Sequence, residues 1–111
     1  MQTSLRREVY QLHAEICQAL SDPTRILILY ELRGGVRNVG DLAEALDAAQ
    51  PTISRHLKVL RDRRLVRADR NGTSVFYSLA DGRVLQALDL LREVLARTFE
   101  NRQALMEEIT A

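Results

Sequence analysis

The sequence has one cysteine, Cys17, and no apolar run that approaches the length of a membrane-spanning helix. A single thiol excludes a disulfide within the chain, and it also excludes an all-cysteine metal site. A membrane span needs about 18 consecutive apolar residues. The first residues lead into an amphipathic pattern, unlike the apolar centre of a signal peptide. These features predict a soluble protein of the cytoplasm with no membrane partner.

The chain has little net charge, +1 at pH 7, but this charge is unevenly distributed. Residues 50–73 hold seven basic residues against two acidic ones, a net charge of +5, so the rest of the chain carries −4. Such a segment is a candidate surface for a polyanion. Because many charge clusters are only solvated surface, the local fold has to decide whether this segment binds a polyanion.

The chain also lacks internal repeats, low-complexity tracts and interdomain linkers. Its 111 residues are enough for one hydrophobic core and too few for separate catalytic and regulatory domains. No nucleophile with a base, phosphate-binding loop or paired carboxylate motif is present. We therefore expect a single domain over residues 1–111 that is not an enzyme.

Apolar residues three or four apart predict a first helix over residues 5–20. Asp22 is a good N-cap and Pro23 a good first residue for a second helix, which we expect to end near residue 33. Apolar residues leave this second helix little polar surface, so it is expected in the core. The apolar residues of this second helix are Ile26, Leu27, Leu29, Tyr30 and Leu32.

Two shorter helices are predicted next, joined by a tight turn over residues 47–50. Asn38 is a good N-cap for the first of them, and Pro51 opens the second. The second helix has an apolar stripe on one side and charged residues on the other. The stripe consists of Ile53, Leu57 and Leu60, and the charged side of Arg55, Lys58 and Asp62. This arrangement is typical of a helix-turn-helix.

Two β-rich runs, residues 65–69 and 75–79, predict a hairpin, and Asn71 followed by Gly72 is the strongest short signal for its turn. After it, Asp81 can cap a last helix about 40 Å long. The predicted fold class is α+β, mostly α: a winged helix-turn-helix with about five helices and a two-stranded β-hairpin wing. The first and last helices carry apolar stripes that one small domain cannot bury, which predicts a homodimer. The stripes are Leu5, Val9, Leu12 and Ile16, and Leu88, Leu91, Leu95 and Phe99.

Three separated stretches resemble the ArsR/SmtB family of regulators. They are ALSDPTRI (19–26), QPTISRHLKVL (50–60) and the hairpin motifs LV (65–66), NG (71–72) and FYSL (76–79). Their order and spacing also agree with the family over residues 12–95. The resemblance implies a homodimer whose first and last helices pack across the twofold axis. It also implies a fourth helix that reads the major groove of double-stranded operator DNA, and repression until an inducer binds.

Within this resemblance, five residues of the fourth helix match positions that face DNA. They are Gln50, Thr52, Ser54, Arg55 and His56. Arginine can pair with guanine O6 and N7, glutamine can read adenine, and hydroxyls can contact a thymine methyl group or a phosphate. Lys58 and Arg61 are better placed for phosphates. As alternatives, Thr52 and Ser54 could cap the helix start, and His56 could pack against the third helix.

The hairpin supplies two further candidate DNA contacts, Arg70 and Asn71, expected at its tip. A cationic side chain there can enter the minor groove or contact its phosphates. Asn71 has a simpler explanation, because asparagine tolerates the left-handed backbone of a tight turn. Arg70 therefore carries most of the functional expectation.

The family's familiar inducer sites are not matched. Metalloid sensors have a Cys-X-Cys pair where this chain has Asn38 and Gly40. Zinc sensors place ligands on the last helix; Asp81 matches one of them, and the others are replaced by Arg83, Val94 and Arg97. Persulfide sensors need two cysteines. We therefore expect no metal and no cofactor at these positions, and the inducer stays unknown.

His13 and Cys17 form a weaker constellation. They stand four residues apart on the first helix, a spacing at which both could bind one ion if the partner subunit added a carboxylate. They are therefore a possible sensor. As the alternative, a cysteine beside an apolar stripe packs as a small hydrophobe.

The sequence thus favours a sequence-specific DNA-binding transcriptional regulator that acts as a repressor. A first alternative is a winged-helix module for protein interaction or assembly, which would not need Arg55, Lys58 and Arg70. A second is a small enzyme or metal-handling protein, for which the sequence supplies neither ligands nor a catalytic set.

Overall fold

A computed structural model of the chain describes residues 2–110, so the two end residues of the expected domain lie outside the described part. The chain forms two compact units: the first ends at Asp81 and the second begins at Gly82. The first unit contains all the strands and every helix except the last. Each unit is described by itself.

The N-terminal segment is helical, but it is not a single α-helix. α1 (Thr3–Leu12) is followed by a π-helical turn, η1 (His13–Cys17), and a 3-10 turn, η2 (Ala19–Ser21). The prediction of one helix over residues 5–20 was therefore right about helical structure and wrong about the geometry after Leu12. Apolar spacing cannot distinguish an α turn from a π turn over so few residues. No residue of α1 is buried.

α2 (Pro23–Leu32) begins as predicted. Oδ1 of Asp22 accepts a hydrogen bond from the backbone N–H of Thr24 at 2.8 Å, and Pro23 occupies the first turn. The buried residues of α2 are Ile28, Leu29 and Leu32. Leu27, which the sequence placed in the core, is 51% exposed. An apolar helix still packs on one side only, and α2 packs on α4 and β3.

The two helices of the helix-turn-helix are α3 (Val39–Ala45) and α4 (Gln50–Asp62). Oδ1 of Asn38 caps α3 by accepting the N–H of Asp41 at 2.8 Å, as predicted. The chain reverses between the helices at Asp47, whose φ is 50°. α4 begins at Gln50, the last residue of the predicted turn. The apolar stripe of α4 is completely buried, as expected: Ile53, Leu57 and Leu60.

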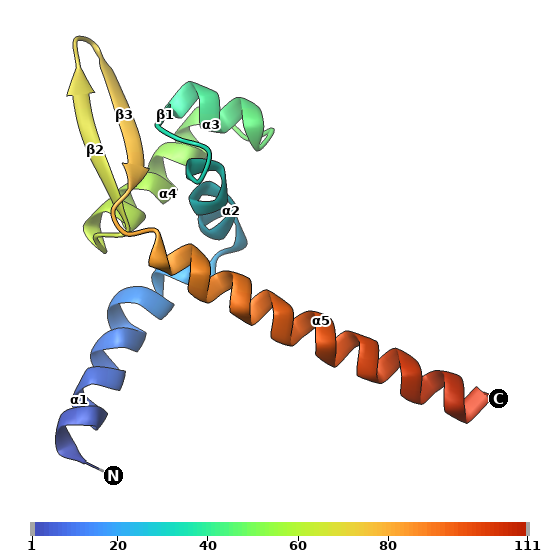
Figure 1. Cartoon of the computed structure of the whole chain (residues 1–111). Helices are drawn as coiled ribbons and strands as arrows, with labels where there is room; N and C mark the ends of the chain where they lie inside the picture. Colours follow the sequence, from blue (N-terminus) through green and yellow to red (C-terminus); the bar gives the residue numbers. More distant parts are fainter. Residues whose placement is uncertain (1, 111) are drawn as a thin grey trace. The chain divides into compact units, whose positions relative to one another are not determined.

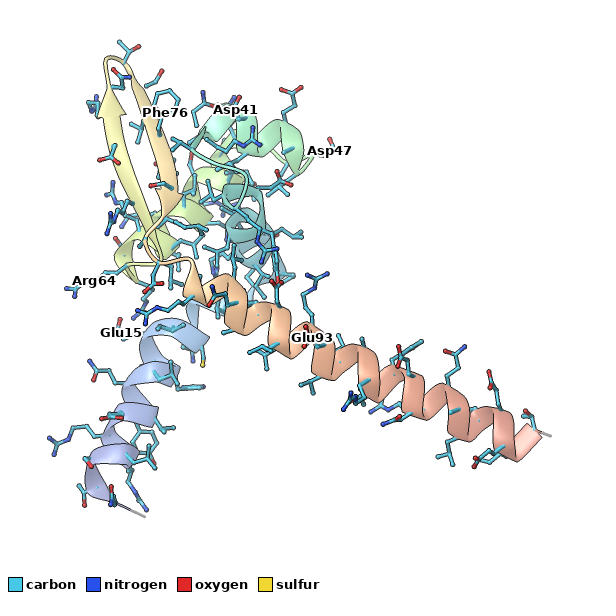
Figure 2. The ribbon with its side chains drawn as sticks, viewed as in Figure 1. Glu15, Asp41, Asp47, Arg64, Phe76 and Glu93 are labelled. Carbon is cyan, nitrogen blue, oxygen red and sulfur yellow. The ribbon has the colours of Figure 1, made fainter. Side chains whose placement is uncertain are left out.

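Two residues after the end of α4, Arg64 has a left-handed backbone, with a φ of 62°. The N–H of Leu65 donates to the carbonyl oxygen of Leu60, and the N–H of Arg64 donates to that of Arg61, both at 2.9 Å. This is the Schellman pattern, which satisfies carbonyl groups at the end of a helix. The side chain of Arg64 points outward at the base of the wing (Figure 2).

The wing is formed by β2 (Val66–Asn71) and β3 (Ser74–Leu79), which pair antiparallel (Figure 1). A third strand, β1 (Arg37–Asn38), pairs with β3, so the strand order is β1-β3-β2. The sequence predicted only two strands. A two-residue strand has no alternation of its own, and only its pairing with β3 defines it.

The turn of the wing also differs from the prediction. Asn71 and Ser74 are the last pair of the ladder, so the two central residues are Gly72 and Thr73. Gly72 has a φ of +67°, whereas Asn71 and Thr73 have no positive φ. A positive φ at the first central position alone is the pattern of a type II′ turn, which takes glycine there. Asn71 is therefore a strand residue and not a left-handed turn residue.

The second unit is one long helix, α5 (Arg83–Thr110), of 28 residues. It begins two residues after Asp81, and its only buried residues are Leu85 and Leu88. The rest of the predicted stripe is open in the single chain: Leu91 is 62% exposed, Leu95 69% and Phe99 66%. In the described part of the chain, no helix is both long and apolar enough to cross a membrane.

Candidate nucleic-acid interface

α4 presents its sequence-predicted DNA-binding residues at two levels of exposure. Gln50, Ser54, Arg55, Lys58 and Arg61 are exposed, and Thr52 and His56 are half-buried. The opposite side of the helix carries the buried apolar stripe. The basic side chains therefore project from a helix that the core holds in place.

Arg55 contacts another candidate on the same helix. Its Nη2 donates a hydrogen bond to Oγ1 of Thr52 at 3.4 Å, one turn earlier. The N-cap of α4 is Ala49, which makes no side-chain cap. The alternative that Thr52 or Ser54 caps this helix is therefore wrong.

Lys58 and Asp62 form an ion pair along α4, with Nζ and Oδ2 3.2 Å apart and both side chains exposed. Exposed pairs of this kind contribute little, about 0.3–0.5 kcal/mol, and are weakened by salt. The pair therefore does not hold Lys58 away from another anion.

His56 differs from the other candidates because its ring contacts a side chain of another helix. Its Nδ1 lies 3.3 Å from Nη1 of Arg25, which belongs to α2. The partner of His56 is therefore a residue of α2, whereas the sequence alternative had named the third helix. The sequence analysis missed Arg25, although it stands in the stretch over residues 19–26 that carries the family resemblance.

Asp22 lies in the same neighbourhood. The backbone N–H of Thr24 lowers the pKa of the Asp22 carboxyl most, burial opposes it by a smaller amount, and the charges of nearby His56 and Arg25 lower the pKa by less again. The start of α2 is thus electrostatically connected to the middle of α4.

In the wing, Arg70 and Asn71 are exposed, at the end of β2 next to the turn. Arg70 pairs with Val75 and Asn71 with Ser74. Arg67, also exposed on β2, was counted in the basic segment but not among the candidate contacts. The alternation of strand side chains puts Arg67 and Asn71 on one face of the hairpin and Arg70 on the other.

The possible sensor residues His13 and Cys17 both lie in η1 and are exposed. The N–H of Gln18 donates to the carbonyl oxygen of His13 at 3.0 Å, a π-type bond. The α-helical spacing assumed from the sequence therefore does not describe this pair. In the described residues, no three His, Cys, Asp or Glu side chains are grouped to hold a metal ion.

The residues at the metalloid-sensor positions do not fit a thiolate metal site. Oδ1 of Asn38 is used to cap α3, and Gly40 has no side chain. A soft metal or metalloid needs thiolate ligands, which neither residue supplies.

Comparison with known proteins agrees with this architecture. Residues 22–68 match the family described as bacterial regulatory protein, arsR family. The chain is 36% identical to the uncharacterized HTH-type transcriptional regulator Rv0081 of Mycobacterium tuberculosis over 104 residues, which are 93% of this chain and 91% of that protein. The chain belongs to the arsR family.

This arsR-family chain is also similar to the HTH-type transcriptional regulator NmtR of Mycobacterium tuberculosis, with 49% identity over 76 residues. The match covers 68% of this chain and 63% of NmtR, less than two thirds of that relative's length.

Solved structures share the fold of the arsR-family chain. The crystal structure of Rv0081 has a TM-score of 0.74 and 36% identity, covering 85% of this chain and 95% of that one. The homodimeric winged helix-turn-helix DNA-binding domain of Mb0332 from Mycobacterium bovis, a possible ArsR-family regulator, has a TM-score of 0.75 and 29% identity, covering 90% and 93%. The predicted winged helix-turn-helix is confirmed.

Proposed function

We propose that this chain is a homodimeric transcriptional repressor that binds double-stranded operator DNA in a sequence-specific manner and is released by an inducer. The observation that carries the proposal is the exposed basic side of α4, opposite a completely buried stripe in a helix-turn-helix. A helix of this size fits the major groove of B-form DNA.

The exposed candidate residues have roles that follow from their positions. Arg55 donates to guanine O6 and N7, and Gln50, at the first turn of α4, reads an adenine. Ser54 contacts a base or a phosphate, and Lys58 and Arg61 neutralise phosphates. In the wing, Arg70 and Asn71 contact the adjacent minor groove or its phosphates.

The dimer is supported by the apolar surface that the single chain leaves open on α1 and α5. A monomeric protein rarely exposes a continuous apolar stripe of this kind, because water contact makes it unfavourable. The Mb0332 domain, which has the same fold, is described as homodimeric.

Selection of DNA from a randomised double-stranded pool tests the proposal. We expect the protein to enrich an imperfect palindrome with half-sites about 10 base pairs apart, or a small extension of that distance. Binding to the enriched sequence should weaken steeply as salt rises. If no sequence is enriched and DNA binding is weak and insensitive to salt, a protein-interaction or assembly module becomes the better interpretation.

A further inference from the structure

The guanidinium of Arg25 is a hydrogen-bonding centre between three segments of the first unit. Nε donates to the carbonyl oxygen of Ala19 at 2.6 Å, and Nη2 donates to that of Gln18 at 3.2 Å and to Oγ of Ser21 at 3.3 Å. Nη1 lies 3.3 Å from Nδ1 of His56. Arg25 therefore joins the segment that follows η1 to the middle of α4.

The contact with His56 defines the state of its ring. An arginine has only donors, so a hydrogen bond between these two atoms requires Nδ1 as the acceptor, with the ring proton on Nε2. The lone pair of Nδ1 is therefore occupied by a residue of α2. Arg55 differs from His56, because its guanidinium donates to Thr52 of its own helix.

A second link joins the same two parts of the fold. Nη1 of Arg63, at the end of α4, lies 3.1 Å from Oε2 of Glu15 in η1. Both side chains of this ion pair are exposed, so solvent screening leaves it little orienting force. Arg25 is half-buried and uses a rigid fork of donors, which fixes directions that a lone ion pair does not.

We propose that Arg25 is a positioning residue for operator binding, and that it acts through His56. Its guanidinium holds α4 in the reading orientation by donating to Nδ1 of His56 and to the carbonyl oxygens of Gln18 and Ala19 at the same time. His56 is then a support of the reading helix and does not contact a base. The proposal rests on the proposed DNA-binding function.

Three substitutions of His56 test which ring nitrogen matters. Asparagine places an oxygen acceptor near the position of Nδ1, glutamine places its amide near Nε2, and leucine has no acceptor. Using the sequence that wild type enriches from a random pool, we expect His56→Asn to bind within about threefold of wild type. His56→Gln and His56→Leu should bind about tenfold more weakly, the scale of one lost hydrogen bond.

The base preference gives an independent readout. On a set of operators with single base-pair changes, His56→Leu should lose affinity equally on every sequence, and its salt dependence should equal that of wild type, because no base or phosphate contact is removed. Glu15→Gln, which breaks only the exposed ion pair, should stay within about twofold of wild type.

Arg25→Lys retains the charge, but one ammonium cannot donate hydrogen bonds to all the acceptors of the guanidinium at once. We expect it to bind about tenfold more weakly, and the double variant with His56→Leu to be no weaker than either single variant. Thermal unfolding and titration of the active fraction separate these losses from misfolding. The His56 variants leave the other bonds of Arg25 in place, so they test the proposal even if Arg25→Lys does not fold.

The experiments distinguish failure of the proposed DNA-binding function from failure of the positioning role of Arg25. If wild type enriches no DNA sequence, the proposed function fails. If wild type binds its selected operator and His56→Gln equals it while His56→Asn is weak, His56 acts through Nε2 and the positioning role is wrong. Additive losses in the double variant, or wild-type affinity in all three His56 variants, would also overturn it.

Discussion

Asn38 and Phe76 are paired across β1 and β3, so the wing is joined to the residue that caps the start of α3. The backbone of Asn38 belongs to the sheet, while its side chain caps the helix by accepting the N–H of Asp41. Figure 2 marks Phe76 and Asp41, which stand on these two elements. One residue thus connects the wing with the helix-turn-helix.

The cap can be removed without altering the strand. Asn38→Ala should lower the free energy of unfolding by about 1 kcal/mol, because the N–H of Asp41 loses its acceptor. Asn38→Asp keeps an acceptor at the helix start and should stay near wild type. Urea unfolding at a fixed protein concentration measures both, and an alanine variant as stable as wild type would show that the cap contributes nothing.

Substitution of a base-reading residue and of a phosphate-contacting residue on α4 should have different effects on DNA binding. Arg55→Ala should weaken binding to the selected operator by about 1–3 kcal/mol and relax the preference at one base pair. Lys58→Gln should weaken binding to all sequences alike and reduce the salt dependence by about one phosphate contact. Unchanged affinity and unchanged preference in folded Arg55→Ala would remove Arg55 from the reading surface.

The apolar stripe of α5 should be the dimer contact. Leu95→Glu places a carboxylate in the stripe and should give monomers at micromolar concentration, because burying an unpaired charge is unfavourable. Ala104 is nine residues away, on the opposite side of the helix at 100° per residue, so Ala104→Glu should remain dimeric. Light scattering measures both variants; a monomeric wild type would contradict the dimer itself.

The carboxyl of Asp22 should make stability depend on acid pH. Its folded pKa lies below the ordinary value of 3.8, so its stabilising contribution is present above that value and is lost as the pH falls through the folded pKa. Asp22→Asn keeps an acceptor for the N–H of Thr24 but does not titrate. The difference in stability between wild type and Asp22→Asn should therefore stay constant above about pH 5 and shrink as the pH falls below 3.8 through the folded pKa; a difference that stays constant into this acid range would contradict the lowered pKa.

Release from DNA should not depend on a metal at the familiar family positions. Asn38 and Gly40 supply no thiolate, and Arg83 cannot lose its proton to become a ligand. We expect zinc and arsenite to leave operator binding of wild type and Cys17→Ser unchanged. Release of both proteins by stoichiometric zinc or arsenite would reveal a site elsewhere, and release of wild type alone by an oxidant or persulfide donor would make Cys17 a sensor.

Local chemistry was enough to predict much of the fold. Asp22 and Asn38 begin α2 and α3 because each has an oxygen acceptor within reach of an N–H in the first helical turn. The buried stripe of α4 followed from helical periodicity. The same periodicity placed Arg55 and Lys58 on the outer side, so the exposed half of the candidate interface was also predictable.

Other features depend on contacts between segments that are distant in the sequence. β1 exists because Arg37 and Asn38 meet β3, and the turn of the wing falls at Gly72 and Thr73 because the strand pairing continues to Asn71. Whether Leu27 was buried depended on which side of α2 packs.

The sequence by itself determined the helices of the helix-turn-helix, the two strands of the wing, their order and the basic side of α4, because capping, periodicity and charge act within a few residues. Only the tertiary structure decided that the ring of His56 contacts the guanidinium of Arg25. The two residues are 31 positions apart, and their hydrogen bond exists only after α2 and α4 have packed together. A polar residue on a helix can face DNA or a neighbouring helix, and only packing distinguishes the two.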